Sequence, residues 1–198
     1  MVFGQKALPK KVVVIDVGHG GVDSGAVGAN GLLEKTVVLD VAKEMVRLND
    51  SLLHAPVVMY LTRYTDTLVS LADRARLARE LQADIFVSLH CNAAVGSSRG
   101  MEVYVPSSGN GELIKASAGL GWAILKESTE KLGLQRRKVI PANFQVLRET
   151  AGCCPAVLAE LGFLTDDVEV EYFLKEKNQT AVALAVLIGI VHFFNDEL

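Results

Sequence analysis

Cysteine is scarce in this 198-residue sequence, and the few cysteines present exclude a disulfide framework. There are three, Cys91, Cys153 and Cys154, so the number is odd and two of them are adjacent. Domains stabilised by disulfides carry even numbers of cysteines. We expect small buried thiols, because free cysteine is among the most buried residue types.

Several other signals are also missing. No block is dense in lysine or arginine and the net charge is −3, so nucleic-acid binding has little support. No uninterrupted apolar run reaches the roughly 18 residues of a membrane span. The nearest, 182–194, is expected to form a C-terminal helix packed on a sheet. The N-terminus lacks the apolar segment of a secretory leader, so the protein either stays inside the cell or has lost a leader that is absent from this chain.

What the sequence does have is an alternation of strand and helix patterns in a chain of one-domain length. Hydrophobic residues make up 50% of it, enough for a complete core. We expect a single domain over 1–198, with its core at about 12–195. The predicted fold is α/β, a three-layer sandwich whose mostly parallel, twisted sheet is flanked by helices on both faces. The expected strands are 12–16, 57–62, 84–90, 101–105, 144–147 and 156–160, and the expected helices are 34–48, 70–81, 113–132 and 178–194.

Two of the four histidines follow predicted strands. His19 comes directly after the first strand and His90 closes the third, at the carboxyl ends where α/β folds gather their ligands. His54 lies in a predicted turn and His192 in an apolar helical run. We therefore expect a surface position for His54 and a packing role for His192.

Alternation along the third strand separates the neighbours of His90. If the segment is extended, His90 and Asn92 point to one side and Cys91 points to the other, into the core. Asn92 is then either a cap at the end of the strand or a residue that forms a hydrogen bond with substrate, and both interpretations stay open.

Glu34 is the candidate third partner of the two histidines. A carboxylate in the first turn of a helix is favoured by the helix dipole, which accounts for it without a ligand. Alternatively, the glycine-rich loop before it folds back and brings Glu34 to His19. Two imidazoles, one carboxylate and an open fourth position match a catalytic zinc site. We therefore predict that His19, Glu34 and His90 bind one Zn²⁺ per chain.

Glu160 ends an otherwise apolar predicted strand. A carboxylate in that position is costly unless it is paired or belongs to a site. It could form a salt bridge with Arg74 or Arg148. Alternatively, it is a general base that takes a proton from water activated by the metal and passes it to a leaving amine.

The motifs together resemble those of the zinc-dependent N-acetylmuramoyl-L-alanine amidases of the Amidase_3 type. They occur in the family's order and cover about residues 12–195. The ordered set is specific, although each motif alone is weak. The matching segments are IDVGHGGVDSGAVGANGLLEK, TR at 62–63, LADRARLA, ADIFVSLHCNA, RGMEVYV, VLRET and PAVLAELGFLTD.

This resemblance implies the same roles for the site residues that their chemistry and positions suggest. It implies zinc ligands at His19, Glu34 and His90 and a catalytic glutamate at Glu160. It also implies the substrate, peptidoglycan or a muropeptide, which is cleaved at the amide between N-acetylmuramic acid and L-alanine.

Three departures from the family pattern are expected to have local effects. Val17 replaces the usual Pro or Ala before the Gly-His-Gly-Gly segment, and Asp166 stands where Asn is common. Some division-linked members insert a long segment that blocks the zinc, where this chain has only the short stretch 105–112. We expect this domain to lack such a blocking element.

Other polar residues are candidates for supporting roles. Arg74 is expected to pair with Glu34 or Glu160 and orient it, rather than to contact substrate. Glu102 either lines the cleft or is an edge-strand charge. The basic stretch 135–138 is expected to form a solvated turn, with contact to the carboxylates of a stem peptide as the alternative.

Two rival functions are considered: a zinc carboxypeptidase-like peptidase acting on another wall amide, and a catalytically inactive wall-binding module. A monomer is expected, without nucleic acid, and a separate targeting or activator partner is considered. The substrate would place the protein in the periplasm or at the cell wall, and delivery as a phage lysin is the other route.

Overall fold

The computed structural model describes residues 10–28, 30–53, 57–94, 96 and 98–196. Six strands of this part of the chain form one sheet, in the order β2-β1-β3-β6-β4-β5. The strands are β1 (Val12–Val17), β2 (Val58–Leu61), β3 (Ile85–Asn92), β4 (Met101–Pro106), β5 (Arg136–Ala142) and β6 (Ala156–Phe163). The helices are α1 (Glu34–Leu52), α2 (Leu71–Glu80), α3 (Gly111–Leu132), α4 (Gln145–Thr150), α5 (Asp167–Phe173) and α6 (Glu176–Asp196).

The sheet is mixed but mostly parallel. β2, β1, β3 and β6 run in one direction, whereas β4 is antiparallel to β6 and β5 is parallel to β4. The carboxyl end of β6 therefore lies beside the beginnings of β4 and β5. This edge gathers the ends of the four parallel strands and the starts of β4 and β5.

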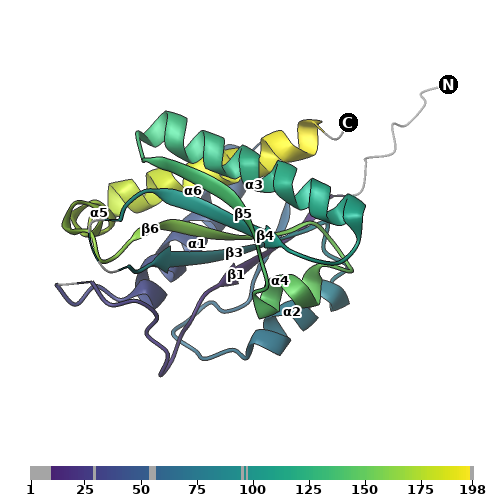
Figure 1. The fold of residues 1–198 in the computed structure, drawn as a ribbon, viewed down its shortest axis with the longest axis horizontal. Coiled ribbons are helices and arrows are strands. Elements are labelled where there is room, and N and C mark those ends of the chain that lie inside the picture. The colour runs from purple at the N-terminus through teal and green to yellow at the C-terminus, as the bar shows by residue number, and fades with distance from the viewer. Residues whose placement is uncertain (1–9, 29, 54–56, 95, 97, 197–198) are drawn as a thin grey trace.

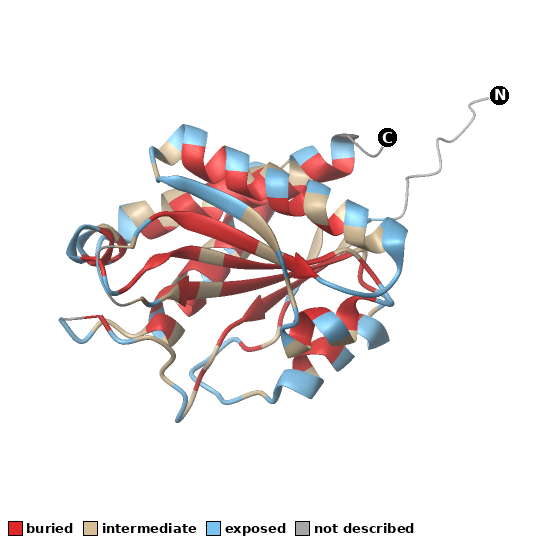
Figure 2. Cartoon of the chain, in the orientation of Figure 1, coloured by how far each residue is buried: buried red, intermediate tan, exposed pale blue. Residues whose placement is uncertain are grey.

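Helices cover both faces of the sheet, which confirms the predicted three-layer α/β fold (Figure 1). The larger apolar cluster joins the sheet to α1, α3 and α6, and the smaller one joins it to α2 and α4. Alternate residues of β1 illustrate this division, since Val13 and Ile15 belong to the first cluster and Val14 to the second. The central strands are buried on both faces (Figure 2), as their continuous β-branched runs predict.

Two local predictions were wrong. The expected strand at 144–147 lies at the start of helix α4, because a short apolar run does not distinguish a buried strand from one helical turn. The expected basic turn at 135–138 instead contains the beginning of edge strand β5. Charged residues are favoured on such an edge, since they oppose pairing with another chain. Helix α5 was not predicted.

Helix α6 is the one described helix that is long and apolar enough to cross a membrane, over Glu176–Asn195. In this fold it packs against α1 and α3. Val182, Val186 and Ile190 are completely buried in the larger core. This packing accounts for the apolar composition of the helix and agrees with the expected C-terminal helix on the sheet.

Candidate active site

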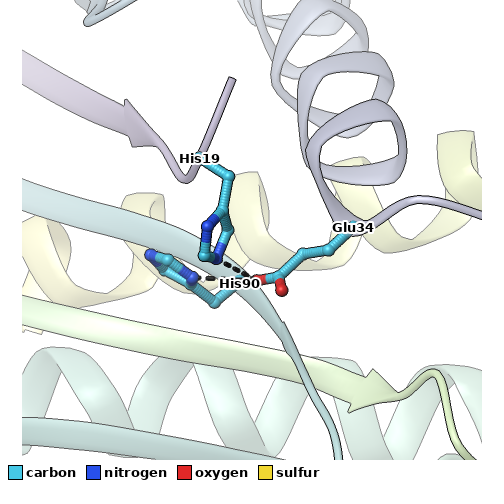
Figure 3. Close-up of side chains that lie close together, drawn as sticks. All are labelled: His19, Glu34 and His90. Atoms are coloured by element: carbon cyan, nitrogen blue, oxygen red, sulfur yellow. Dashed lines mark hydrogen bonds and ion pairs between the residues drawn. The ribbon is translucent and has the colours of Figure 1, made fainter. Parts of the chain in front are cut away.

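Three side chains from distant parts of the sequence converge at one end of the sheet (Figure 3). His19 follows β1, Glu34 begins α1 and His90 lies near the end of β3. One nitrogen or oxygen atom of each lies within 4.8 Å of the others. Oε1 of Glu34 is 3.1 Å from His19 Nε2 and 2.8 Å from His90 Nδ1. The structure thus brings the three predicted ligands together.

The backbone around the cluster needs glycine. A Cβ atom on Gly18 would lie 2.6 Å from Cε1 of the His90 ring, and one on Gly25 would collide with the Glu34 carboxylate. His19 itself has φ 57, an unusual left-handed conformation for a non-glycine residue. Such backbone costs of order 1–3 kcal/mol and persists only where its surroundings hold it. The glycines therefore leave space for the ligands, and other contacts must hold His19.

Two buried arginines provide those contacts. Nη2 of Arg74 donates to the carbonyl oxygen of His19 at 2.8 Å, and Nη2 of Arg63 donates to that of Gly18 at 2.8 Å. Arg74 also forms a buried ion pair with Asp16 at 2.8 Å. We call Arg63 and Arg74 the arginine clamp.

The expectation that Arg74 orients Glu34 or Glu160 was therefore wrong. Asp16 is 1% exposed, and a carboxylate so buried requires a cation or several donors. Arg74 supplies the cation from α2. Arg148, the other proposed partner of Glu160, instead donates to the side chain of Asn143.

Further contacts fix which ligand atoms face the centre. Oδ2 of Asp23 lies 2.8 Å from His19 Nδ1, which leaves His19 Nε2 for the cluster. The Glu34 carboxylate accepts hydrogen bonds from the backbone N–H groups of Ala26 at 2.7 Å and Cys91 at 2.9 Å. A carboxylate behind a histidine ligand is a common way to orient the ring in metal sites. Sequence reasoning missed Asp23, although its place four residues after His19 in the same loop was visible.

The electrostatics of the cluster favour a cation. Burial opposes the charged forms, yet the hydrogen bonds with Glu34 and Asp23 raise the pKa of His19 to about 9. Although burial again acts in the opposite direction, the bonds from His19 and His90 lower the pKa of Glu34 to about 2. The Glu34 carboxylate is therefore ionised near neutral pH, and its negative charge stabilises positive charge at the site.

The donor set fits Zn²⁺. Imidazole nitrogen and carboxylate oxygen are ordinary zinc ligands, and three protein ligands with an accessible fourth position characterise catalytic sites. Glu34 is buried, whereas His19 and His90 are partly exposed and line a cleft. Approach from the cleft thus leads to the open side of the cluster.

The cleft has a volume of about 770 Å³, and Glu160 lines it together with the two histidines. Oε2 of Glu160 is buried and has no hydrogen-bond partner among the described residues. Burial raises the pKa of Glu160 to about 7. His90 opposes this shift, whereas the negative charges of Glu34 and Glu102 add to it. A carboxylate with such a pKa can both accept and donate a proton near neutrality.

The other rim of the cleft is apolar. Leu68, Leu71 and Phe144 line it and are roughly half exposed. The Phe144 and Tyr104 rings pack in a T-shaped arrangement, with centroids 5.1 Å apart. The cleft thus combines an ionisable floor with an apolar rim.

A polar network lies beside Glu160. Glu102 is paired with Glu160 across β4 and β6, and it is buried. Its Oε1 accepts hydrogen bonds from Asn92 Nδ2 and the Tyr104 hydroxyl, each at 2.8 Å. Its Oε2 accepts one from Arg137 Nε at 2.6 Å. In this structure the Asn92 side chain is therefore engaged by Glu102.

Several expectations concern residues outside the cluster. Cys91 and Cys154 are buried as expected, but Cys153 is exposed because it lies in the turn before β6. His192 is also exposed, and its ring lies 3.3 Å from Glu127, so a packing role for it was wrong. His54 lies outside the described residues.

The stretch 105–112 joins the end of β4 to the beginning of α3, and none of its residues lines the cleft. That the domain lacks a blocking element stays a prediction.

Comparison with known proteins connects these features to a family. The model for N-acetylmuramoyl-L-alanine amidase, Amidase_3, matches residues 13–192. The chain is 37% identical over 185 residues to the Bacillus subtilis protein YqiI, covering 93% of this chain and 85% of that protein. It is 37% identical over 187 residues to an endolysin of Bacillus phage SPP1, covering 93% of this chain and 66% of the endolysin.

Solved structures show the same fold. An N-acetylmuramoyl-L-alanine amidase from Clostridium difficile 630 superposes with a TM-score of 0.86 at 29% identity, covering 96% of this chain and 99% of that one. The catalytic domain of the amidase CwlV from Bacillus (Paenibacillus) polymyxa gives 0.82 at 35% identity, covering 93% and 98%.

Proposed function

Because this chain belongs to the N-acetylmuramoyl-L-alanine amidase family Amidase_3, we propose that it hydrolyses the amide joining N-acetylmuramic acid to L-alanine in peptidoglycan. The observation that carries this proposal is the juxtaposition of two groups in one cleft: the His19–Glu34–His90 cluster and the unpartnered carboxylate oxygen of Glu160. Amide hydrolysis needs both, since one must activate the carbonyl and the other must transfer protons.

His19, Glu34 and His90 would hold a single Zn²⁺. When bound there, zinc supplies Lewis acidity, which polarises the scissile carbonyl and lowers the pKa of a water molecule to about 7. Asp23 keeps the His19 ring in the orientation that presents Nε2, and the arginine clamp fixes the backbone that carries it. The chain's own contribution is thus a prearranged set of donors.

Glu160 would act as the general base and then as the general acid. Its carboxylate removes a proton from the attacking water, and the resulting carboxylic acid delivers that proton to the departing nitrogen of alanine. Because no described residue forms a hydrogen bond with Oε2, this oxygen is available for the transfer. The Glu102 charge in the neighbouring strand favours the protonated form of Glu160, which assists the second step.

The deciding experiment replaces the base and leaves the ligands intact. Glu160→Gln should retain one zinc per chain but lose about 10²- to 10⁴-fold in kcat on a defined muropeptide, the usual contribution of acid–base catalysis. Glu80→Gln, an exposed site on α2, is the matched control and should keep full activity. Undiminished turnover by the Glu160 variant would remove Glu160 from the mechanism.

Product analysis separates the amidase from its rivals. Mass spectrometry should find a peptide with a free L-alanine amino terminus. Release of a carboxyl-terminal residue would instead identify a carboxypeptidase. Zinc binding without any cleavage would identify an inactive wall-binding module.

The substrate also bears on where the protein works. Among its relatives are the N-acetylmuramoyl-L-alanine amidase LytC of Bacillus subtilis, of which this chain spans 36%, and the phage endolysin. We propose action on the cell wall outside the cytoplasmic membrane, reached by secretion or by phage-type lysis. We also propose that the protein is a monomer and that a separate partner targets or activates it.

A further inference from the structure

We propose that Arg137 is a specificity-determining residue that binds a carboxylate of the substrate peptide, on the amino acid that follows L-alanine. This inference rests on the proposed amidase function. It concerns the polar side chains beyond Glu160, where β4 and β5 extend the sheet.

Strand pairing places the residues in a row. His90 is paired with Glu160 across β3 and β6, and Glu160 is paired with Glu102 across β6 and β4. Paired residues project from the same face of a sheet. Arg137 continues the row on β5, because its Nε donates to Oε2 of Glu102 at 2.6 Å. The row therefore leads from the metal cluster, past the general base, to a guanidinium group.

The guanidinium group is held in place but keeps donors free. Glu102 binds it through Nε, and the group lies over the ring of Phe163, 5.0 Å from the centroid. Nη1 has one long contact, 3.4 Å to the carbonyl oxygen of Arg99, and no described residue accepts a hydrogen bond from Nη2. The Arg137 side chain is 34% exposed, whereas that of Glu102 is 6% exposed. The Nη edge is thus the part that can meet a ligand.

Glu102 does not compete for that edge. Both of its oxygens are occupied, Oε1 by Asn92 and Tyr104 and Oε2 by Arg137 itself. It orients the guanidinium group, which in turn offers donors in the planar arrangement that fits a carboxylate. The ligand that this geometry favours is an anion at the far end of the row.

The spacing selects the position of that anion in the substrate. Neighbouring strands lie about 4.8 Å apart, so the two spacings from β6 to β4 and from β4 to β5 separate Glu160 from Arg137 by roughly 10 Å. The scissile nitrogen must lie within about 3 Å of Glu160 to receive its proton. From that nitrogen, the alanine residue and the N–Cα and Cα–carboxyl bonds of the next residue extend about 5–7 Å farther. The α-carboxylate of the residue after alanine therefore reaches Arg137, whereas alanine has no free carboxylate.

The experiment pairs two substrates with two arginine variants. The substrates are N-acetylmuramoyl-L-alanyl-D-glutamate linked onward through its γ-carboxyl, and the same compound with the glutamate α-carboxylate converted to an amide. Arg137→Gln is compared with Arg136→Gln, whose guanidinium group lies instead over the Trp122 ring of α3, 5.3 Å from the centroid. All proteins are zinc-loaded, and their zinc content and thermal midpoints are checked first.

The wild-type protein should prefer the free carboxylate. Arg137→Gln should lose about 10- to 100-fold in kcat/KM on that substrate, mainly through KM, and should change less than about threefold on the amidated one. Arg136→Gln should leave both values unchanged, and Arg137→Lys should restore part of the preference. Equal losses on the two substrates would overturn the inference, because they would mean that Arg137 acts only by holding Glu102. If the wild-type protein produces no free L-alanine amino terminus from either substrate, the proposed function itself fails.

Discussion

His19 is presented by a strained turn whose carbonyl groups are bound by buried arginines. Asp16 connects this turn to the sheet, because it accepts hydrogen bonds from the hydroxyl groups of Thr62 and Ser88 as well as from Arg74. Arg74 is 2% exposed, so its charge is compensated almost entirely by these protein groups. The same residue therefore supports both the stability of the fold and the position of a ligand.

Replacing Arg74 should be costly. Arg74→Met leaves Asp16 as a buried charge without its cation, and breaking a buried ion pair in this way costs about 3–5 kcal/mol. The free energy of unfolding in urea, measured with a metal chelator present, tests the prediction. Arg76→Met on the same helix is the control, because its ion pairs with Asp73 and Glu80 are exposed and should contribute less than about 1 kcal/mol. Similar losses in the two variants would contradict a special role for Arg74.

The sequence predicted the residues whose chemistry is distinctive, and missed those whose role depends on the path of a loop. Histidine and glutamate at strand ends and at a helix start suggested ligands because strand topology alone brings such positions together. Asp23 and Arg63 reach the site through the conformation of irregular segments, which no periodic pattern encodes. Arg74 was identified as a supporting residue but given the wrong partner, because nothing in the strand pattern showed that Asp16 needs a cation.

Among the elements, α3 and α6 approach each other closely at one glycine. A Cβ atom on Gly189 of α6 would lie 2.6 Å from Cα of Ile124 and 2.9 Å from its backbone nitrogen. Backbone atoms of a helix cannot move aside as a flexible side chain can. The absence of a side chain at Gly189 therefore sets how closely these two helices pack.

A methyl group at this crossing should destabilise the protein. Gly189→Ala is expected to lower the free energy of unfolding by about 1–3 kcal/mol through overpacking. Gly119→Ala in α3 is the matched control, because its Cβ would meet only the Phe193 ring at 3.8 Å. That change should be neutral or stabilise the helix by about 0.5–1 kcal/mol. Urea unfolding of both variants distinguishes them, and equal stabilities would show that the crossing tolerates a wider spacing.

The elements with a clear apolar pattern were predictable, and those without one were not. Helices α1 and α3 and the buried strands have periodic apolar patterns that continue for several turns or residues, and each was found with small errors at its ends. Helix α4 has only six residues, too few to show a helical period. Strand β5 is mostly exposed and rich in arginine, so it lacks the apolar alternation by which strands are recognised. Arg137 of this strand carries the inference about substrate, so a segment without an apolar pattern can still contribute to a site.

At the scale of the whole molecule, the candidate metal site joins the loop after β1 to α1 and β3. These three elements form the packed centre of the domain with α6 and the rest of the sheet. Unfolding must separate His19, Glu34 and His90, and the unfolded chain has no preformed site. Ion binding and folding are therefore thermodynamically linked.

Zinc should raise the thermal midpoint of the protein. At a free zinc concentration about 100-fold above its dissociation constant, binding to the native state alone adds about 2.7 kcal/mol. For a chain of this size each kcal/mol corresponds to about 2–4 °C, so the midpoint should rise by about 5–10 °C. Calorimetry of chelator-treated protein with and without zinc measures the shift. His19→Ala should abolish it, whereas His192→Ala should keep it, since that exposed ring beside Glu127 lies outside the cluster. A shift that survives in His19→Ala would mean that zinc stabilises the fold from another place, and would remove the main physical support for a three-ligand centre.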